Sequence, residues 1–185
     1  MARWRVWRRR TALGALLLLA AGCARPNGDD HLLRKAYELG EAYEWEAVRS
    51  YAKRYLTEHP DSAPGHMLYG RSYLRLHAPN LAIAKGELDT ALALFNASPD
   101  LGVLADTWNP GKFVGDIHHE MATVYLRHLH ALSSEGVGAA VIQHDLEEAR
   151  RHVDLGLEAD PSNPSLQLMR KTLADLGSSD ASVPA

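Results

Sequence analysis

The stretch EEARRHVDLGLEADP, residues 147–161, decides the fold that we expect for this chain. Ala149, Val153 and Gly156 follow one another at intervals of four and three residues, which places them on one face of a helix. Small residues at the first and last of these positions let a second helix approach closely. Pro161 cannot continue the helix and ends the unit. The stretch therefore predicts a helix that packs closely on a neighbour and stops at a proline corner.

Proline corners of the same kind divide the rest of the chain. They lie at 59–64, 97–100 and 160–164, and each follows one helical pattern and precedes another segment. A proline starts a helix well but cannot continue one, so we interpret the corners as turns between helices. Apolar residues keep a helical period from His31 to Leu176, without an alternating strand pattern. The expected helices pair as 31–40 with 43–58, 64–77 with 80–97, and 113–134 with 141–159, and a closing helix follows at 163–176.

These patterns resemble the tetratricopeptide (TPR) repeat family. Residues 147–161 resemble the second helix of a TPR unit, and Tyr69-Gly70-Arg71-Ser72-Tyr73 resembles its first-helix L-G-x-x-Y segment. Residues 121–125 repeat that segment with Ala122 in place of the glycine, and residues 43–48 resemble the start of a second helix. The resemblance implies an all-α fold: a right-handed TPR-like superhelix of about three irregular helical hairpins with a C-terminal capping helix.

The expected array is irregular. Pro60, Pro99 and Pro161 are 39 and 62 residues apart, whereas a TPR unit has about 34. The stretch Leu101–Lys112 forms a long connection that contains Trp108. Long ordered connections often carry function or cover an edge of the core. We expect Trp108 to be buried.

The first 22 residues are typical of a secretory signal peptide. They contain five arginines and no acidic residue. The basic part ends at Arg10, and the apolar run Ala12–Ala21 and then Gly22 follow. About ten apolar residues are too few to span a bilayer, for which about 20 are needed, but they match the core of a signal peptide. We therefore expect residues 1–22 to be a cleaved leader.

The end of the leader resembles the lipobox of bacterial lipoproteins. Leu19-Ala20-Ala21-Gly22-Cys23 ends at the only cysteine in the chain. The resemblance implies that Cys23 carries a covalent lipid, the one cofactor-like group we expect, and that residues 23–30 form an acylated tether. Ala24, where an aspartate would retain such a protein at the inner membrane, implies the outer membrane, facing the periplasm. Beyond the TPR-like helical domain at 31–176, residues 177–185 are expected to form a flexible tail.

Composition excludes several classes of protein. With 46% hydrophobic and 23% charged residues, the chain is not of a disordered type. Removing the five leader arginines leaves 15 basic residues against 23 acidic ones, a formal charge of −8. Binding to nucleic acid needs a basic surface, so we expect no nucleic-acid partner. One cysteine excludes an intramolecular disulfide and any multi-cysteine metal site.

No catalytic constellation stands out, and we expect no enzymatic activity. His118-His119-Glu120 begins like a zinc-protease motif, but Thr123 stands where the second histidine ligand would be required. The chain has neither a complete nucleophile elbow nor a P-loop.

The ten histidines leave a metal-binding reading open. His144, Glu148 and His152 recur every four residues, and adjacent members could chelate one ion on a helix surface. Polar stripes on helix surfaces are common, however, so we expect no metal site.

The TPR resemblance also implies a partner-binding groove. In TPR proteins the first helices line a concave face that binds peptides or helices. Aligning Gly70 and Ala122 with the family pattern places eight residues on that face: Met67, Arg71, Leu74, Arg75, Asp116, His119, Thr123 and Arg127. Their three arginines suggest a groove for an acidic or C-terminal peptide, because arginine pairs bidentately with carboxylates. The alternative is that these arginines form salt bridges with neighbouring side chains.

The expected function is therefore that of a membrane-anchored TPR-like adaptor or scaffold lipoprotein. Its partners would be proteins of bacterial envelope assembly or transport, and the lipid anchor would join it to the membrane. Two alternatives stay open: a histidine-rich metal-binding lipoprotein, and a ligand-binding accessory subunit of a transporter.

Overall fold

The computed structural model describes residues 29–132 and 138–179. The signal peptide, Cys23, residues 23–28 of the tether and residues 180–185 lie outside this range. The expectations for them therefore stay predictions.

The described residues form helices and no strands. Seven α-helices and one 3₁₀ helix follow one another: α1 (Asp30–Glu41), α2 (Trp45–Glu58), α3 (Ala63–Arg75), α4 (Leu81–Ala97), η1 (Gly102–Leu104), α5 (Pro110–Leu132), α6 (Ala139–Ala159) and α7 (Pro164–Ser179). All seven expected α-helices are present, with ends within three residues of the predicted ones. The largest differences are that α5 begins earlier, at Pro110, and that α7 continues to Ser179, into the segment expected to be a flexible tail.

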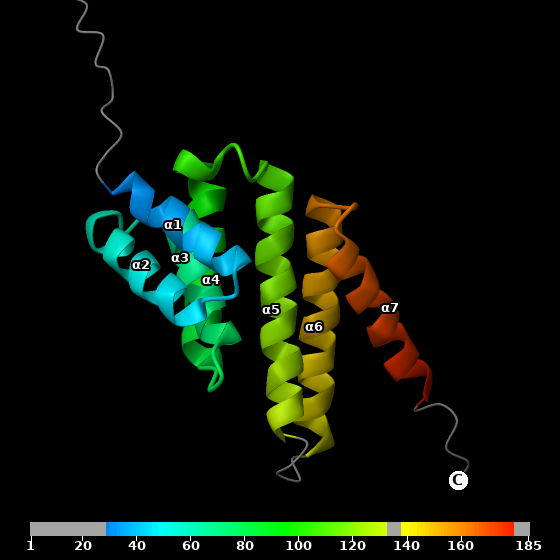
Figure 1. Cartoon of the computed structure of the whole chain (residues 1–185). Coiled ribbons are helices and arrows are strands. Elements are labelled where there is room, and N and C mark those ends of the chain that lie inside the picture. The colour runs from blue at the N-terminus through cyan, green and yellow to red at the C-terminus, as the bar shows by residue number, and fades with distance from the viewer. Residues whose placement is uncertain (1–28, 133–137, 180–185) are drawn as a thin grey trace, which may run out of the picture.

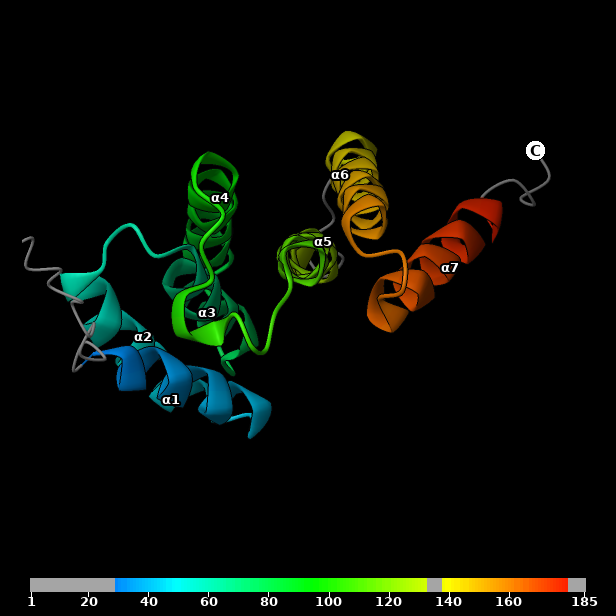
Figure 2. The same ribbon diagram turned by 90° about the horizontal axis from the view of Figure 1, so that it is seen from above.

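The helices stack as a chain of antiparallel hairpins (Figure 1). Each α-helix packs on the next one in sequence, and α3 also contacts α1 and α5. Seen from above, α4 and α6 lie on one side of the array and α1 on the other, and α7 lies at the end of the array beside α6 (Figure 2). Among the described helices, none is long and apolar enough to cross a membrane.

The corners between helices are capped by side chains. Ser62 accepts a hydrogen bond from the Gly65 amide at 3.2 Å, and Asn80 accepts one from the Ile83 amide at 3.0 Å. The side chain of Asn163 likewise accepts from the Leu166 amide at the start of α7. Such caps satisfy backbone donors that have no partner inside the helix, so the predicted corners become fixed turns.

Two glycines show why the repeat-like segments pack so closely. A Cβ added at Gly156 would lie 2.7 Å from a methyl carbon of Leu166 and 3.1 Å from Cβ of His118, where α5, α6 and α7 meet. At Gly70 it would lie 2.9 Å from Cβ of Glu87 and 3.0 Å from the Ala84 carbonyl oxygen. Any larger residue would force the helices apart, as the sequence pattern suggested.

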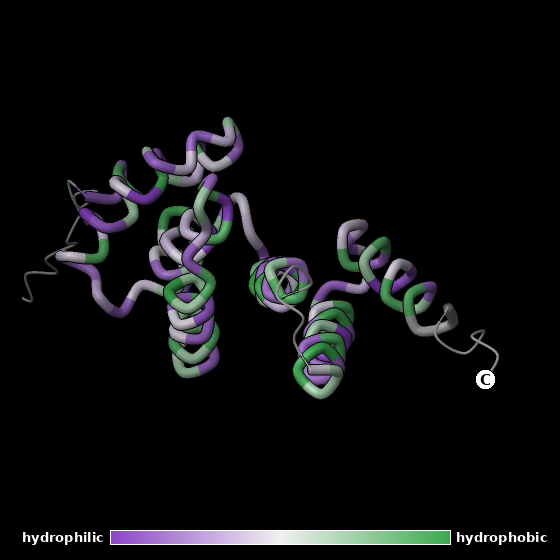
Figure 3. The backbone as a smooth tube through the Cα atoms, turned by 90° about the horizontal axis from the view of Figure 1, so that it is seen from below, coloured by the Kyte–Doolittle hydropathy of each residue, from purple (hydrophilic) through white to green (hydrophobic). Residues whose placement is uncertain are grey.

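The core has two parts that meet at α5. The larger cluster joins α1 to α5, and the smaller one joins α5, α6 and α7. Around each helix, hydrophobic residues alternate with hydrophilic ones, as expected when only part of the helix surface is buried (Figure 3). Trp108 belongs to the larger cluster and is 2% exposed, which confirms its predicted burial. The connection before α5 therefore covers the core.

Candidate partner-binding face

The inward stripe of α5 carries the candidate site. Asp116, Glu120, Thr123 and Arg127 recur at intervals of four, three and four residues, so they lie along one face of this helix. Eleven residues of helix span about 16 Å. The stripe passes α3 at its middle, and two cavities flank this contact.

A buried carboxylate with two arginines occupies the middle of the stripe. Glu120 is 1% exposed. Its carboxylate lies 3.0 Å from Nε of Arg71, and Nη2 of Arg75 donates to both of its oxygens at 3.0 and 2.9 Å. Burial acts to raise the pKa of Glu120, but the neighbouring His119 side chain and the charges of Arg75 and Arg71 outweigh it and lower the pKa. The carboxylate therefore stays charged and ties α5 to α3.

A polar pocket of about 210 Å³ lies at one end of this ion-pair cluster. Side chains of α1, α3, α5 and α7 and of the adjoining connections line it: Tyr37, Glu41, Arg71, Trp108, Lys112, Asp116, His119, Glu120, Asn163 and Ser165. It therefore presents cationic and anionic groups side by side. All four odd-numbered helices of the described residues contribute to this pocket.

Asp116 is fixed at the wall of the polar pocket. One of its oxygens accepts from the Trp108 indole at 3.0 Å and the other from the Asn163 amide at 3.3 Å. Burial raises the pKa of Asp116, and the hydrogen bond from Trp108 only partly offsets this. Trp108 thus links the core to the pocket wall, and Asn163 links α7 to α5.

An apolar groove of about 750 Å³ lies toward the other end of the stripe. It runs between the corner that joins α3 to α4 and the second half of α5. Its lining residues are Ala78, Pro79, Leu81, Thr123, Leu126, Arg127, His130 and Ala131.

The eight predicted groove residues do not form a single surface. Arg71, Asp116 and His119 line the polar pocket, and Thr123 and Arg127 line the apolar groove. Arg75 forms an ion pair with Glu120, and so does Arg71. For these two arginines the alternative of salt bridges with neighbouring side chains therefore applies.

Met67 and Leu74 require a correction. Both are fully buried in the larger cluster and line neither cavity, so they are not available to a partner. The reason is the central position of α3, which packs against α1, α2, α4 and α5. On a helix at the end of the array these positions would be exposed, but on α3 the neighbouring helices cover them on both sides.

Sequence reasoning missed several residues of the pocket. Lys112 lies one helical turn before Asp116 on the same face of α5, and this spacing could have identified it. Tyr37 and Glu41 come from α1, where no motif was found. Asn163 was interpreted only as part of a proline corner, although its amide reaches Asp116.

The histidine stripe of α6 does not form a three-ligand arrangement. His152 faces inward and lies 3.0 Å from His118, measured between the two Nδ1 atoms, while Glu148 pairs with Arg151. In the part of the chain that the structure describes, no group of three or more histidine, cysteine, aspartate or glutamate side chains is placed to hold a metal ion.

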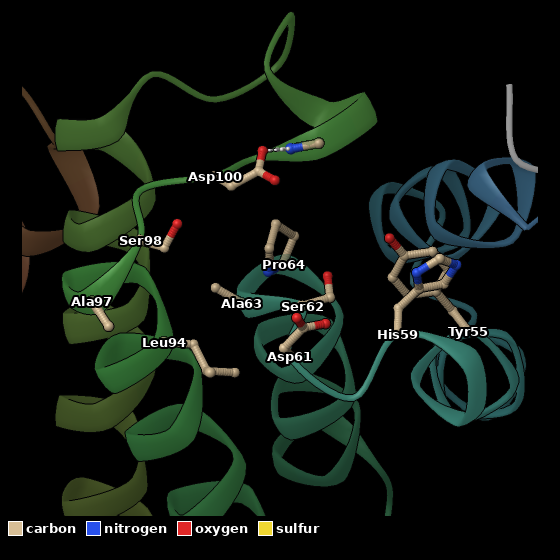
Figure 4. Close-up of a pocket in the computed structure, with 11 residues that line it drawn as sticks. Tyr55, His59, Asp61, Ser62, Ala63, Pro64, Leu94, Ala97, Ser98 and Asp100 are labelled. Carbon is tan, nitrogen blue, oxygen red and sulfur yellow. Dashed lines mark hydrogen bonds between the residues drawn. The ribbon is translucent and has the colours of Figure 1, made fainter. Parts of the chain in front are cut away.

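A further cavity, of about 390 Å³, lies near the α2–α3 corner and the end of α4 (Figure 4). Tyr55 stacks on His59 along one side, with ring centroids 4.5 Å apart. Ser62 caps α3, and Asp100 accepts a hydrogen bond from the Gly102 amide. Because these polar groups serve the turns, we regard this cavity as part of the corner structure. None of the predicted site residues lines it.

Comparisons with known proteins identify the fold. No protein-family model matches the sequence, and no curated protein matches it. Two of the solved structures that are similar are TPR domains. One is the NMR structure of the first TPR domain of the human RPAP3 protein, with 15% identity and a TM-score of 0.57 over 85% of this chain and 99% of that one. The other is the first TPR of Spaghetti (RPAP3) bound to the HSP90 peptide SRMEEVD, with 15% identity and a TM-score of 0.49 over 81% and 93%.

The first of these similarities defines the fold class. Together with the helical-hairpin architecture, it confirms the predicted all-α, TPR-like fold. At 15% identity it shows the fold alone, so the function rests on the site.

Proposed function

We propose that this protein is a TPR-like adaptor that binds a segment of a partner protein on the inward face of α5. The observation that carries the proposal is the polar pocket, which side chains of α1, α3, α5 and α7 and their adjoining connections build together. A site that needs every odd-numbered helix of the array depends on the array being complete. A helical-repeat fold is suited to presenting such an extended binding surface.

The ion-pair cluster of Arg71, Arg75 and Glu120 prepares the face for binding. It fixes the distance between α3 and α5, and Asp116 is held by two further hydrogen bonds. A preformed surface loses less conformational entropy when a partner binds, so more of the contact energy appears as affinity.

Lys112 is the residue through which the pocket would recognise an acidic side chain or a C-terminal carboxylate. Arg71 and Arg75 had suggested such a ligand, but Glu120 neutralises much of their charge. Lys112 is exposed at the pocket, and its Nζ has only the Thr107 carbonyl oxygen within 3.4 Å. Its ammonium group is therefore available for a carboxylate of the partner.

The lipobox resemblance adds a location to this proposal. A lipid on Cys23 would anchor the adaptor to the outer membrane on the periplasmic side, since two or three acyl chains hold stably where one does not. The six peptide units that join Cys23 to Asp29 reach at most about 21 Å, so the helical array would stay close to the membrane. The search of the adaptor for its partners in envelope assembly or transport would then be restricted to the plane of the membrane.

The anchor can be tested separately from the binding face. The full chain and its Cys23→Ser variant are expressed in a Gram-negative host, membranes are separated, and the mass of the intact protein is measured. We expect the wild-type chain in the outer membrane, cleaved before Cys23 and carrying acyl groups. A wild-type chain of unmodified mass in the soluble fraction would contradict the anchor.

The binding face is tested by site-directed crosslinking. A photo-reactive amino acid is placed at position 41, an exposed residue of α1 that lines the polar pocket, and a control chain carries it at position 54, which is exposed on α2. We expect a discrete crosslinked partner from position 41 and none from position 54. The same pattern of products from both positions would contradict the proposal.

A further inference from the structure

The apolar groove continues the proposed binding face. Thr123 and Arg127 follow Asp116 by seven and eleven residues on the same face of α5, so the groove lies about 10–16 Å beyond the polar pocket. The ion-pair cluster separates the two cavities. A partner segment that contacts the polar pocket and continues along α5 reaches the groove.

The lining of the groove is apolar with a basic residue on it. Ala78, Pro79 and Leu81 form one wall, and Leu126 contributes from α5. An apolar cavity of about 150 Å³ holds a benzene ring, so a groove of about 750 Å³ has room for several apolar side chains.

Arg127 stands out in this lining. No aspartate or glutamate belongs to the described residues that line the groove. Arg127 also forms no hydrogen bond or ion pair with any residue in the described ranges, unlike Arg71 and Arg75. Arginine stays charged at every physiological pH, and its planar group matches a carboxylate. The groove therefore has a fixed positive charge that nothing in the described chain compensates.

The shape of the groove favours a segment of a protein over a small molecule. Ala78, Pro79 and Ala131 are exposed, so the groove is open along its length. Sites for small molecules usually enclose most of the ligand surface. An open apolar groove is typical of a site for an amphipathic helix, whose apolar residues recur every three and four positions.

We propose that the apolar groove docks an acidic amphipathic helix of the partner, with its apolar side chains on Leu81 and Leu126 and a carboxylate on Arg127. This inference rests on the proposed function, because it assigns the partner of the same face. Burial of apolar side chains supplies affinity, and the pair with Arg127 fixes the direction and register of the helix.

The probe is a synthetic fluorescent peptide with leucines spaced three and four residues apart and glutamates beside them. Its binding to the purified full chain is measured by fluorescence anisotropy. A second peptide carries lysine in place of each glutamate, and sodium laurate serves as a small carboxylated competitor. Circular dichroism confirms that each variant is folded.

Two variants test the groove, and two serve as controls. Arg127→Glu reverses the unpaired charge, and Ala78→Trp fills the groove from an exposed corner position. Lys53→Glu and Arg54→Glu each reverse one exposed charge on α2, and neither residue lines the groove. We expect the glutamate peptide to bind the wild-type chain and both controls, and to bind each groove variant about tenfold more weakly.

A charge exchange completes the test. We expect the lysine peptide to bind the wild-type chain weakly and to regain affinity for the Arg127→Glu variant, because the charges are then complementary again. Equal binding of the glutamate peptide to the wild-type chain and both groove variants would overturn the inference. So would the absence of binding at about 1 mM peptide. Binding of laurate without binding of the peptide would identify a small-molecule site instead.

The adaptor proposal can stand when this inference fails. In that case Lys112→Glu abolishes crosslinking to the natural partner while Arg127→Glu leaves it unchanged. Loss of crosslinking in Arg127→Glu but not in Lys112→Glu would mean that the groove binds the partner and the polar pocket does not.

Discussion

The two sides of α5 each bury a titratable side chain, one in its charged form and the other in its neutral form. Toward α3, the helix buries the charged Glu120 between two arginines; toward α6, it buries the neutral ring of His118 against His152. These residues of α5 are only two positions apart, and they point to opposite sides of the helix. One junction depends on charge being present, and the other depends on its absence.

The proton positions of the histidine pair follow from its neighbours. Nη2 of Arg151 lies 3.0 Å from Nε2 of His152, and a guanidinium group can only donate. The Nε2 atom therefore accepts, so neutral His152 carries its proton on Nδ1 and donates it to His118. A proton added to His118 Nδ1 would break this arrangement.

Burial and then the charge of Arg151 lower the pKa of His118 to about 4. Burial, Arg151 and His118 together lower the pKa of His152 to about 4. The two junctions should thus differ in their response to substitution and to acid, and this difference can be measured.

The largest expected effect is at Glu120. Glu120→Gln leaves two arginines facing each other without a carboxylate, although both can turn partly toward water. Breaking a buried ion pair costs about 3–5 kcal/mol, and we expect about 3 kcal/mol here. Chemical denaturation measures this loss, with the exposed Glu147→Gln on α6 as the control. A loss no larger than that of the control would mean that Glu120 does not hold the two helices together.

The next effect concerns the glycine at the neutral junction. Gly156→Ala places a methyl group against Leu166 and His118, and such overpacking costs about 1–3 kcal/mol. Gly86→Ala on α4 is the matched control, because nothing lies within 4 Å of its new Cβ. We expect Gly86→Ala to stabilise the protein by about 0.5–1 kcal/mol, as alanine does in an exposed helix. Opposite signs for the two variants in urea unfolding support the close packing of α5, α6 and α7.

Acid should weaken the neutral junction before the charged one. An unfolded histidine binds its proton near pH 6.5, whereas His118 and His152 do so near pH 4 in the fold. Their contribution to stability is complete above about pH 6.5 and is lost as the pH falls from there to about 4. The pKa of Glu120 is lowered in the fold, so its contribution to stability is lost only below about pH 4.5, where the unfolded carboxylate takes up a proton.

The variant His152→Gln separates these two effects. Melting temperatures measured between pH 7 and pH 4 should fall less steeply for this variant than for the wild-type chain. Equal slopes would show that the histidine pair does not set the response to acid.

The smallest expected effect on stability is at Arg127. Arg127→Glu should change the free energy of unfolding by less than about 0.5 kcal/mol, because Arg127 has no partner among the described residues. A clear loss of stability in urea unfolding would show that Arg127 supports the fold and would remove it as a selective probe of binding.

Local sequence signals predicted most of the fold. Pro64 and Pro161 mark corners, Gly70 and Gly156 mark close helix contacts, and the apolar period predicted every described α-helix. Such signals act over a few residues and need no knowledge of the neighbours. Only the repeat resemblance linked them into one array.

The binding face was harder to predict because it depends on which sides of each helix are covered. Met67 and Leu74 share a stripe with Arg71, yet the helices around α3 bury them completely. Glu120 was interpreted as part of a failed zinc motif, although it holds the two predicted arginines. The predictions for Cys23 rest on the lipobox resemblance, since this residue lies outside the described range.

The most direct test of the account is the affinity of the crosslinked partner for matched variants of the polar pocket. Once the partner is identified, its purified form is titrated with the wild-type chain, with Lys112→Glu and with Arg54→Glu. Both lysine and arginine are exposed, so neither change should affect folding. The account predicts affinity about tenfold lower for Lys112→Glu and unchanged for Arg54→Glu. Equal affinity for all three proteins would contradict the claim that the inward face of α5 binds the partner.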